Sequence, residues 1–357
     1  MEKGQATGSL PSSQQADPKQ KKRVMRALVL WTILFYASIV SVIVLSGFGF
    51  VYSAKWMLWH TVNIMNGLLI LVVPCFVLLA GLVLGNKWIV QNVLAHRTDI
   101  FKKAFTRVGF QRYFDVGAYT YKRNLAQLIR CSGVCCRDWG KMRVNDQVTG
   151  VRKGLRFLLL DLCLKGGFKT LFQGQMFVVE LPKYINWRSF DIQTEIVNQT
   201  HDFDSTAAMQ NTLFKEEFVF SYPEQNAGIL NVLSQYGFEN NEKSEKTRLL
   251  PGNTYTPDEL LSDDFARFLV SLREQYSGIF LHVQRNYLFI AFGSVENDGE
   301  DLFEPMRFDI FRQYEKIEQR VFDQVKTCVD VLDGLIDATH MVPDRVVTVL
   351  EMRPAVL

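Results

Sequence analysis

Two stretches decide the organisation of this chain: Ala27–Tyr52, ALVLWTILFYASIVSVIVLSGFGFVY, and Thr61–Gly85, TVNIMNGLLILVVPCFVLLAGLVLG. They contain 26 and 25 residues without a charged side chain. A helix needs about 20 apolar residues to cross the hydrocarbon core of a bilayer, so each stretch is long enough. A buried soluble helix or a cleaved signal peptide fits less well, because two such stretches follow one another. Residues 27–86 are therefore predicted to form a transmembrane hairpin, with spans at about 27–52 and 61–85.

The basic residues around the hairpin predict its orientation. Lys and Arg precede the first span and follow the second, whereas Ser53–His60, the expected connecting loop, carries only Lys55. The flanking basic residues are Lys19, Lys21, Lys22, Arg23, Arg26, Lys87, Arg97, Lys102, Lys103 and Arg107. Segments rich in Lys and Arg stay in the cytoplasm, so both the N-terminus and the C-terminus are expected there.

The interior of the spans favours helix packing over transport. Gly81-Leu-Val-Leu-Gly85 is a pattern of small residues that lets two helices approach closely. We expect it to pack the two spans together; a contact with a partner is the alternative. Neither span contains Asp, Glu or Arg, the residues that form proton relays and ion paths, so a channel or transporter is disfavoured.

Charge is distributed unevenly along the remainder of the chain. Residues 1–26 form a basic tail whose Gly, Ser and Gln content is typical of disorder. Residues 87–169 hold 17 Lys and Arg against five acids, a net charge of +12, and residues 170–357 hold 16 against 30, a net charge of −14. Such asymmetry suggests a charged partner or surface.

The basic block next to the hairpin is predicted to be helical over residues 87–130. Its candidates for contact with anionic lipid head groups are Lys102, Lys103, Arg107 and Arg112. A solvated helix face explains these residues equally well, because membrane topology alone selects for basic flanks. The aromatic residues of this block could stack on nucleic acid, but its place beside a membrane favours lipid or protein, and no nucleic-acid partner is expected.

Residues 131–340 are predicted to form a cytosolic α+β domain of β-hairpins flanked by helices, followed by a C-terminal tail at 341–357. We expect a turn at Gly166-Gly167 and hairpin turns at Gln173-Gly174 and at 284–286. Thr256, as N-cap before Pro257, should open a helix that reaches about Tyr276. A last helix is expected from about Asp309 to Asp337. The expected strands are Leu155–Leu164, Phe168–Phe172, Met176–Leu181, Glu217–Tyr222, Gly278–Val283 and Tyr287–Phe292.

The sequence contains no recognisable catalytic constellation. The cluster Cys131-Ser-Gly-Val-Cys135-Cys136 lacks a second pair at zinc-site spacing, so reduced structural thiols are the better interpretation. We find no nucleophile elbow, phosphate loop or dinucleotide fingerprint. No catalytic residue, metal ligand or cofactor is therefore predicted, although catalytic residues that converge only in space would escape such a search.

The order of several short segments resembles that of a known family. They are Asp146-Gln-Val-Thr-Gly150, Phe168-Lys-Thr-Leu-Phe172, Val178-Val-Glu-Leu-Pro182, Phe214-Lys-Glu-Glu-Phe218, Thr256-Pro257, Ile279–Val283, Asn286–Ala291 and Leu302-Phe-Glu304-Pro305. In this order, after a membrane hairpin, they resemble the bacterial domain-of-unknown-function family 3137. The resemblance covers about residues 99–340.

The resemblance implies a location and a partner but no activity. It implies a bacterial inner-membrane protein with two spans and a cytosolic domain, and a partner of the LemA type, a membrane-anchored helical protein. Residues 228–255 look like an insertion relative to the family. The motif positions, whose roles are unknown, are Asp146, Gly150, Phe168, Phe172, Pro257, Glu304 and Pro305.

Three functions are compatible with the sequence, and a sensor that relays an external signal ranks last because the expected loop Ser53–His60 is short. The leading hypothesis is a membrane-anchored scaffold or adaptor without catalytic activity, whose basic block faces the membrane and whose acidic part recruits a protein. The alternative is a membrane-tethered hydrolase or transferase whose active site forms no sequence motif. The second hypothesis predicts a deep pocket lined by titratable groups in the soluble domain.

Overall fold

The computed structural model describes residues 18–60, 67–121, 125–132, 139–167, 169–182, 184–185, 189–194, 218–221, 229–234, 238, 254–255, 260–294 and 314–340. The chain divides into two compact units. Residues 1–106 and 304–320 form the first, and residues 107–303 and 321–357 form the second.

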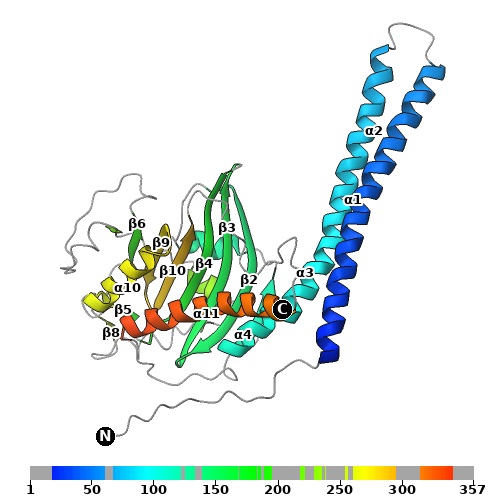
Figure 1. Cartoon of the computed structure of the whole chain (residues 1–357). Coiled ribbons are helices and arrows are strands. Elements are labelled where there is room, and N and C mark those ends of the chain that lie inside the picture. The colour runs from blue at the N-terminus through cyan, green and yellow to red at the C-terminus, as the bar shows by residue number, and fades with distance from the viewer. Residues whose placement is uncertain are drawn as a thin grey trace. The chain divides into compact units, whose positions relative to one another are not determined.

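The first unit is built on a helical hairpin. Helices α1 (Pro18–His60) and α2 (Gly67–Trp88) lie antiparallel and side by side (Figure 1). The helix continues after α2 through a π-helical segment η3 (Ile89–Leu94), α3 (Ala95–Phe101) and a second π-helical segment η4 (Lys102–Thr106).

Two glycines set the close approach of α1 and α2. A Cβ atom on Gly81 would lie 2.6 Å from Ser46 Oγ, and one on Gly85 would lie 2.5 Å from Val42 Cγ1. Only a residue without a side chain fits at these positions. The small-residue pattern therefore packs the two helices against each other, as the sequence predicts.

Two expectations for this region are corrected. Residues 53–60, the expected loop, form the last turns of α1, because no Gly or Pro interrupts the helix there. Residues 18–26 form the first turns of α1 and so do not belong to a disordered tail, whereas residues 1–17 lie outside the described part.

The second unit contains an eight-stranded sheet in the order β1-β2-β3-β4-β10-β9-β6-β7, in which all neighbours are antiparallel. A separate parallel pair joins β5 (Tyr184–Ile185) and β8 (Thr254–Tyr255). The strands of the large sheet are β1 (Asp115–Tyr121), β2 (Lys141–Arg152), β3 (Leu155–Gly166), β4 (Lys169–Glu180), β6 (Phe190–Thr194), β7 (Phe218–Ser221), β9 (Gly278–Gln284) and β10 (Tyr287–Ser294).

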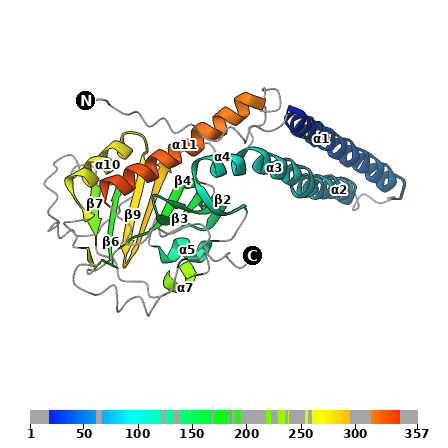
Figure 2. The same ribbon diagram turned by 90° about the horizontal axis from the view of Figure 1, so that it is seen from below.

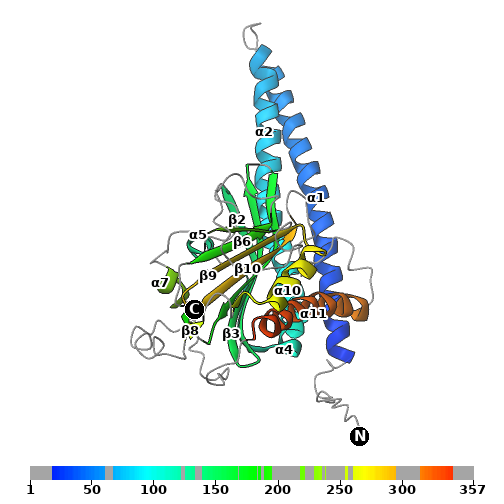
Figure 3. The same cartoon turned by 90° about the vertical axis from the view of Figure 1, so that its left-hand side faces the viewer.

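Helices cover both faces of this sheet (Figures 2 and 3). Helix α10 (Asp263–Arg273) and most of α11 (Tyr314–Ala338) lie on one face, and α5 (Ala126–Cys131) and α7 (Ile229–Ser234) lie on the other. Central strands are consequently buried on both sides, and every residue of Leu155–Leu164 in β3 is buried. The α+β class expected from the sequence is confirmed.

The expected hairpin at Gln173-Gly174 is wrong, because β4 runs straight through it. The chain turns earlier, at Gly166-Gly167, where Gly167 has a φ of +63°. Gly174 instead faces Gly293 of β10, and a Cβ atom on it would lie 2.6 Å from the Gly293 Cα atom. The glycine marks a close approach of two backbones rather than a turn. The expected hairpin between β9 and β10 is confirmed, with Arg285 at a φ of 55°.

Two helical expectations also change. The predicted helix 87–130 stops with α4 (Arg107–Tyr113), and residues 115–121 form strand β1 paired with β2. The helix predicted from Thr256 to about Tyr276 is interrupted at residues 261–262, and α10 begins at Asp263 with Ser262 as its N-cap: the Phe265 N–H donates to Ser262 Oγ. Asp263 and Asp264 supply the acidic first turn that favours a start here. Residues 256–259 and 309–313 lie outside the described part.

Candidate membrane-binding surface and polar clusters

Most of the apolar surface of the hairpin faces outward. Leu45 on α1 is 69% exposed and Leu84 on α2 is 66% exposed. The structure contains two helices that are long and apolar enough to cross a membrane. In a core helix of a soluble protein these side chains would be covered by protein. Here they form an exposed apolar surface on both helices.

Exposed basic side chains flank the apolar run of each helix. Lys22, Arg23 and Arg26 are exposed on α1, and Lys87 is exposed at the end of α2. Lys21 is partly buried: its Nζ atom lies 3.6 Å from Glu315 Oε1 and 5.0 Å from the centre of the Tyr314 ring. Burial, and then the carboxylates of Glu318 and Glu315, raise the pKa of Tyr314 to about 12. The phenol therefore stays neutral beside Lys21.

The four predicted lipid-facing residues do not share one environment. Lys102 is only 1% exposed, so its ammonium group is not available to a lipid head group. Lys103 is 66% exposed and forms an ion pair of 2.9 Å with Asp99, one helical turn away. Arg107 and Arg112 are exposed, and the Arg112 guanidinium carbon lies 4.9 Å from the centre of the Phe322 ring. Lys103, Arg107 and Arg112 remain the candidates. The π-helical segment η3, which precedes Lys102, shifts the helical phase that the sequence pattern assumes.

The first π-helical segment brings an exposed histidine against α1. Asn92 Nδ2 donates to the Trp88 carbonyl oxygen at 3.0 Å, and His96 Nδ1 lies 2.7 Å from the Asn92 carbonyl oxygen. The His96 ring stacks on Trp31 with ring centres 4.8 Å apart. This contact joins α3 to α1 within the apolar run of α1.

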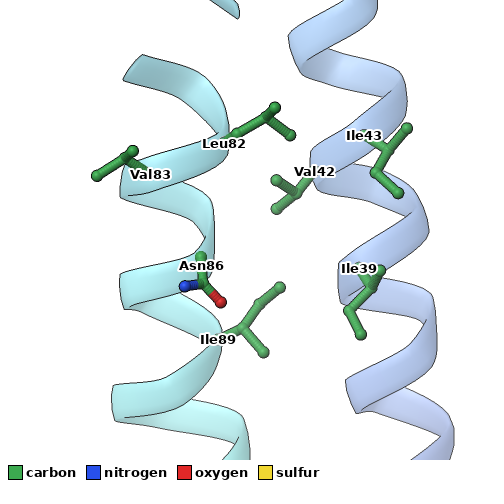
Figure 4. A pocket seen from close by; sticks show the side chains of 7 residues that line it. All are labelled: Ile39, Val42, Ile43, Leu82, Val83, Asn86 and Ile89. Carbon is green, nitrogen blue, oxygen red and sulfur yellow. The ribbon is translucent and has the colours of Figure 1, made fainter. Parts of the chain in front are cut away.

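A groove runs between the two long helices (Figure 4). It has a volume of about 360 Å³ and is lined by aliphatic side chains and one amide. The lining residues are Ile39, Val42, Ile43, Leu82, Val83, Asn86 and Ile89. The groove thus has an apolar wall on each helix and a polar group near one end.

In the second unit, one arginine links three elements. Arg152, at the end of β2, donates from Nε to Asp333 Oδ1 at 2.8 Å and from an Nη atom to Asp333 Oδ2 at 2.5 Å. Its other Nη atom donates to the Tyr113 carbonyl oxygen at 3.0 Å. Next to it, Lys153 pairs with Asp337 at 2.5 Å. The β2–β3 turn is thereby fastened to both α11 and the end of α4.

A histidine–carboxylate pair lies on the sheet face that α5 and α7 cover. His282 of β9 is 3% exposed, and its Nδ1 atom lies 2.5 Å from Asp191 Oδ1 of β6. Its Nε2 atom lies 3.3 Å from Gln284 Oε1. A carboxylate that orients an imidazole in this way occurs in catalytic triads, but it also satisfies a buried histidine.

A second buried polar group lies between the sheet and α11. Burial, and then the nearby Asp161 carboxylate, raise the pKa of the Cys328 thiol far above its usual value. Burial, and then the charge of Cys328, raise the pKa of Tyr276 to about 12. A thiol held in its protonated form is a poor nucleophile, so Cys328 is a structural residue.

The motif positions have structural surroundings where they are described. Asp146 is buried in β2 and accepts a hydrogen bond of 2.6 Å from the Tyr119 hydroxyl group. Gly150 pairs with Phe157 in the neighbouring strand, and the fully buried Phe172 packs edge-on against Phe280. Phe168, Pro257, Glu304 and Pro305 lie outside the described part.

The sequence search missed the paired side chains because they are far apart in the chain. Asp191 and His282 are 91 residues apart, and Arg152 and Asp333 are 181 residues apart. One indication was present: His282 and Gln284 share one face of a strand whose other face carries Leu281 and Val283. Two adjacent polar side chains on an otherwise apolar strand indicate a buried polar pair.

Within the residues that the structure describes, no three His, Cys, Asp or Glu side chains come together as a metal site. Cys135, Cys136 and His201 lie outside those residues. No family model matches the sequence, and no curated protein and no solved structure matches the chain. The resemblance to family 3137 therefore stays a prediction.

Proposed function

We propose that this protein is a two-pass inner-membrane protein whose cytoplasmic domain is a scaffold or adaptor. The observation that carries the proposal is the exposed apolar surface of α1 and α2, in which exposed Lys22, Arg23 and Arg26 precede the apolar run of α1 and exposed Lys87 follows that of α2. Basic residues at one end of both helices support a cytoplasmic position of that end. Both termini then lie in the cytoplasm.

The exposed charge of α10 and α11 supports recruitment of a basic partner. The exposed acids of these helices in the second unit outnumber the exposed bases Arg267 and Lys326. We call the exposed acids Asp263, Asp264, Asp323, Asp330 and Asp337 the acidic face. Charge complementarity accelerates association and selects the partner more than it adds affinity. By the resemblance, a LemA-type membrane protein is the proposed partner.

The adaptor proposal is tested by purification from native membranes in mild detergent, followed by mass spectrometry of associated proteins. A chain lacking residues 1–86 is compared with the full-length chain. A stoichiometric partner with both chains, lost when Asp323 and Asp330 are replaced by Asn, is the expected result. Thr327→Ala, an exposed neutral position on the same helix, is the matched control. Capture that survives the Asp323 and Asp330 substitutions contradicts the assignment of the acidic face.

The membrane-surface part of the proposal concerns Lys103, Arg107 and Arg112. We expect each replacement by Glu to weaken binding of the chain lacking residues 1–86 to anionic vesicles, by about fivefold for loss of each basic charge. Lys102→Gln, at a buried position, serves as the comparison. If vesicle binding is unchanged after all three charge reversals, Lys103, Arg107 and Arg112 do not contact lipid head groups.

The His282–Asp191 pair favours one second candidate, a membrane-tethered hydrolase or transferase. In that case His282→Gln abolishes turnover of an ester or thioester panel and leaves partner capture intact. In an adaptor, the same substitution changes only stability. If the purified protein turns over no ester or thioester of the panel, the enzyme hypothesis is contradicted.

A further inference from the structure

The groove between α1 and α2 has the composition of a site for a lipid chain. Six of its seven lining residues are aliphatic, and the seventh is Asn86. In Figure 4, Leu82, Val42 and Ile89 lie between the two helices, Ile39 and Ile43 lie over α1, and Asn86 lies beside Ile89. An apolar wall of branched aliphatic side chains fits a methylene chain and offers it no hydrogen-bond partner except at the amide.

The groove follows from the way the helices meet. Gly81 and Gly85 bring α2 onto Ser46 and Val42, so the backbones approach closely along one line. The bulkier Leu82, Val83 and Ile43 stand beside that line and form the walls. Gly81 and Gly85 are covered by α1, so these two glycines do not offer a third helix a close approach at the groove. An acyl chain fits between branched side chains without such small residues.

The polar end of the groove carries a positive charge. Asn86 follows Leu82 by four residues and Lys87 follows Val83 by four, so the amide and the ammonium group lie one turn along the same helix faces from these two side chains, and Ile89 continues the aliphatic lining past Asn86. Lys87 is exposed. In the proposed orientation this end reaches the cytoplasmic leaflet, which contains the anionic lipids.

We propose that the groove binds one acyl chain of an anionic phospholipid, with the phosphate at Asn86 and Lys87. The proposal rests on the proposed membrane insertion and names a ligand for it. It is distinct from the surface formed by Lys103, Arg107 and Arg112, which would contact head groups without holding a chain.

The test uses the full-length protein in vesicles that contain a photoreactive phosphatidylglycerol or a photoreactive phosphatidylcholine, each with its reactive group in the acyl chain. After irradiation, labelled peptides are identified by mass spectrometry. We expect label concentrated at residues 39–43 and 82–89, and stronger with phosphatidylglycerol. Lys87→Gln should reduce the phosphatidylglycerol label about fivefold, the factor that one basic residue contributes at an anionic surface.

Two matched variants decide whether the groove is responsible. Val83→Trp fills the groove and should bring its label down to the level of the rest of the helix. Leu84→Trp, at an exposed position outside the lining, should leave the label unchanged. Label spread evenly around both helices, or unaffected by Val83→Trp, overturns the proposal. So does a cross-link between two copies at residues 82–89, because it identifies a second chain as the occupant.

The two proposals fail separately. A protein that resists extraction by alkaline carbonate but labels evenly is membrane-inserted and has no lipid site in the groove. If alkaline carbonate extracts the protein from the vesicles, the membrane proposal and the lipid proposal are both contradicted.

Discussion

The two units place the same apolar residue types in opposite environments. On α1 and α2, side chains such as Leu45 and Leu84 are about two-thirds exposed, whereas every residue of Leu155–Leu164 in β3 is buried. Both segments read as nearly continuous apolar runs. Their lengths differ: a strand needs only a few residues to cross a domain, and a helix needs about 20 to cross a bilayer. The length of an apolar run, more than its hydrophobicity, therefore predicts whether it is buried inside a domain or exposed toward a bilayer.

The sheet should tolerate no extra atom where its backbones meet. Gly174→Val should destabilise the second unit by about 3 kcal/mol or more, because its Cβ would overlap the β10 backbone at Gly293. Gly140→Ala has no atom within 4 Å of the new Cβ and should have no effect beyond about 0.5 kcal/mol. Hydrogen exchange of the β3 and β4 amides in urea measures both. Equal stabilities of the two variants would contradict the close packing.

One substitution made in both units tests the comparison itself. Leu160→Ala removes a fully buried side chain and should cost about 3 kcal/mol of sheet stability through the cavity that it leaves. Leu84→Ala removes an exposed side chain on α2 and should leave the exchange of the sheet amides unchanged. If Leu84→Ala destabilised the sheet as much as Leu160→Ala, the hairpin surface would be part of a protein core.

The Arg152 contacts should contribute less than the core. Asp333→Asn removes the charge from a partly buried bidentate pair and should cost about 1.5–2 kcal/mol. Asp330→Asn, an exposed acid one turn earlier on α11, should stay within about 0.5 kcal/mol. Urea unfolding of the two variants at low and high salt separates them, since the exposed position depends more on screening.

Alkaline pH should weaken the second unit gradually. The pKa of Tyr276 is raised from 10.0 to about 12, and the pKa of Cys328 is also raised, so the folded state holds both protons more tightly than the unfolded state. The stability from Tyr276 is complete below pH 10 and is lost as the pH rises to about 12. Tyr276→Phe should remove part of this loss in unfolding measured from pH 9 upward. A steeper loss in Tyr276→Phe would reverse the sign and refute the assignment.

The sequence predicted most elements that a local pattern defines. The two apolar helices, the buried strand at Leu155–Leu164 and the β9–β10 hairpin were all expected at their observed places. Local patterns failed where distant segments decide. The local pattern predicts a turn at Gly174, but this residue pairs with β10 inside a strand. It predicts a helix over residues 115–121, but these residues form β1 and pair with β2. The sequence pattern places Lys102 on an exposed helix face, but it is buried in the structure, after the π-helical segment η3.

The partners within the polar clusters could not be predicted. His282 and Asp191 meet only because β6 and β9 are neighbours in the sheet, and Arg152 meets Asp333 only because α11 lies on it. No spacing in the sequence encodes either pair. The sequence shows the charge imbalance between the two parts of the chain. Only the structure shows that acidic side chains lie on the exposed sides of α10 and α11.

The membrane orientation of the hairpin is the central claim, and cysteine labelling tests it directly. Trp59→Cys on α1 and Ser271→Cys on α10 are made at exposed positions in a chain whose other cysteines are serine. A membrane-impermeant maleimide should label Cys at position 59 from outside intact bacterial spheroplasts, and should label position 271 only after the membrane is opened. Labelling of position 271 in intact spheroplasts, or of position 59 only after opening, would contradict the account.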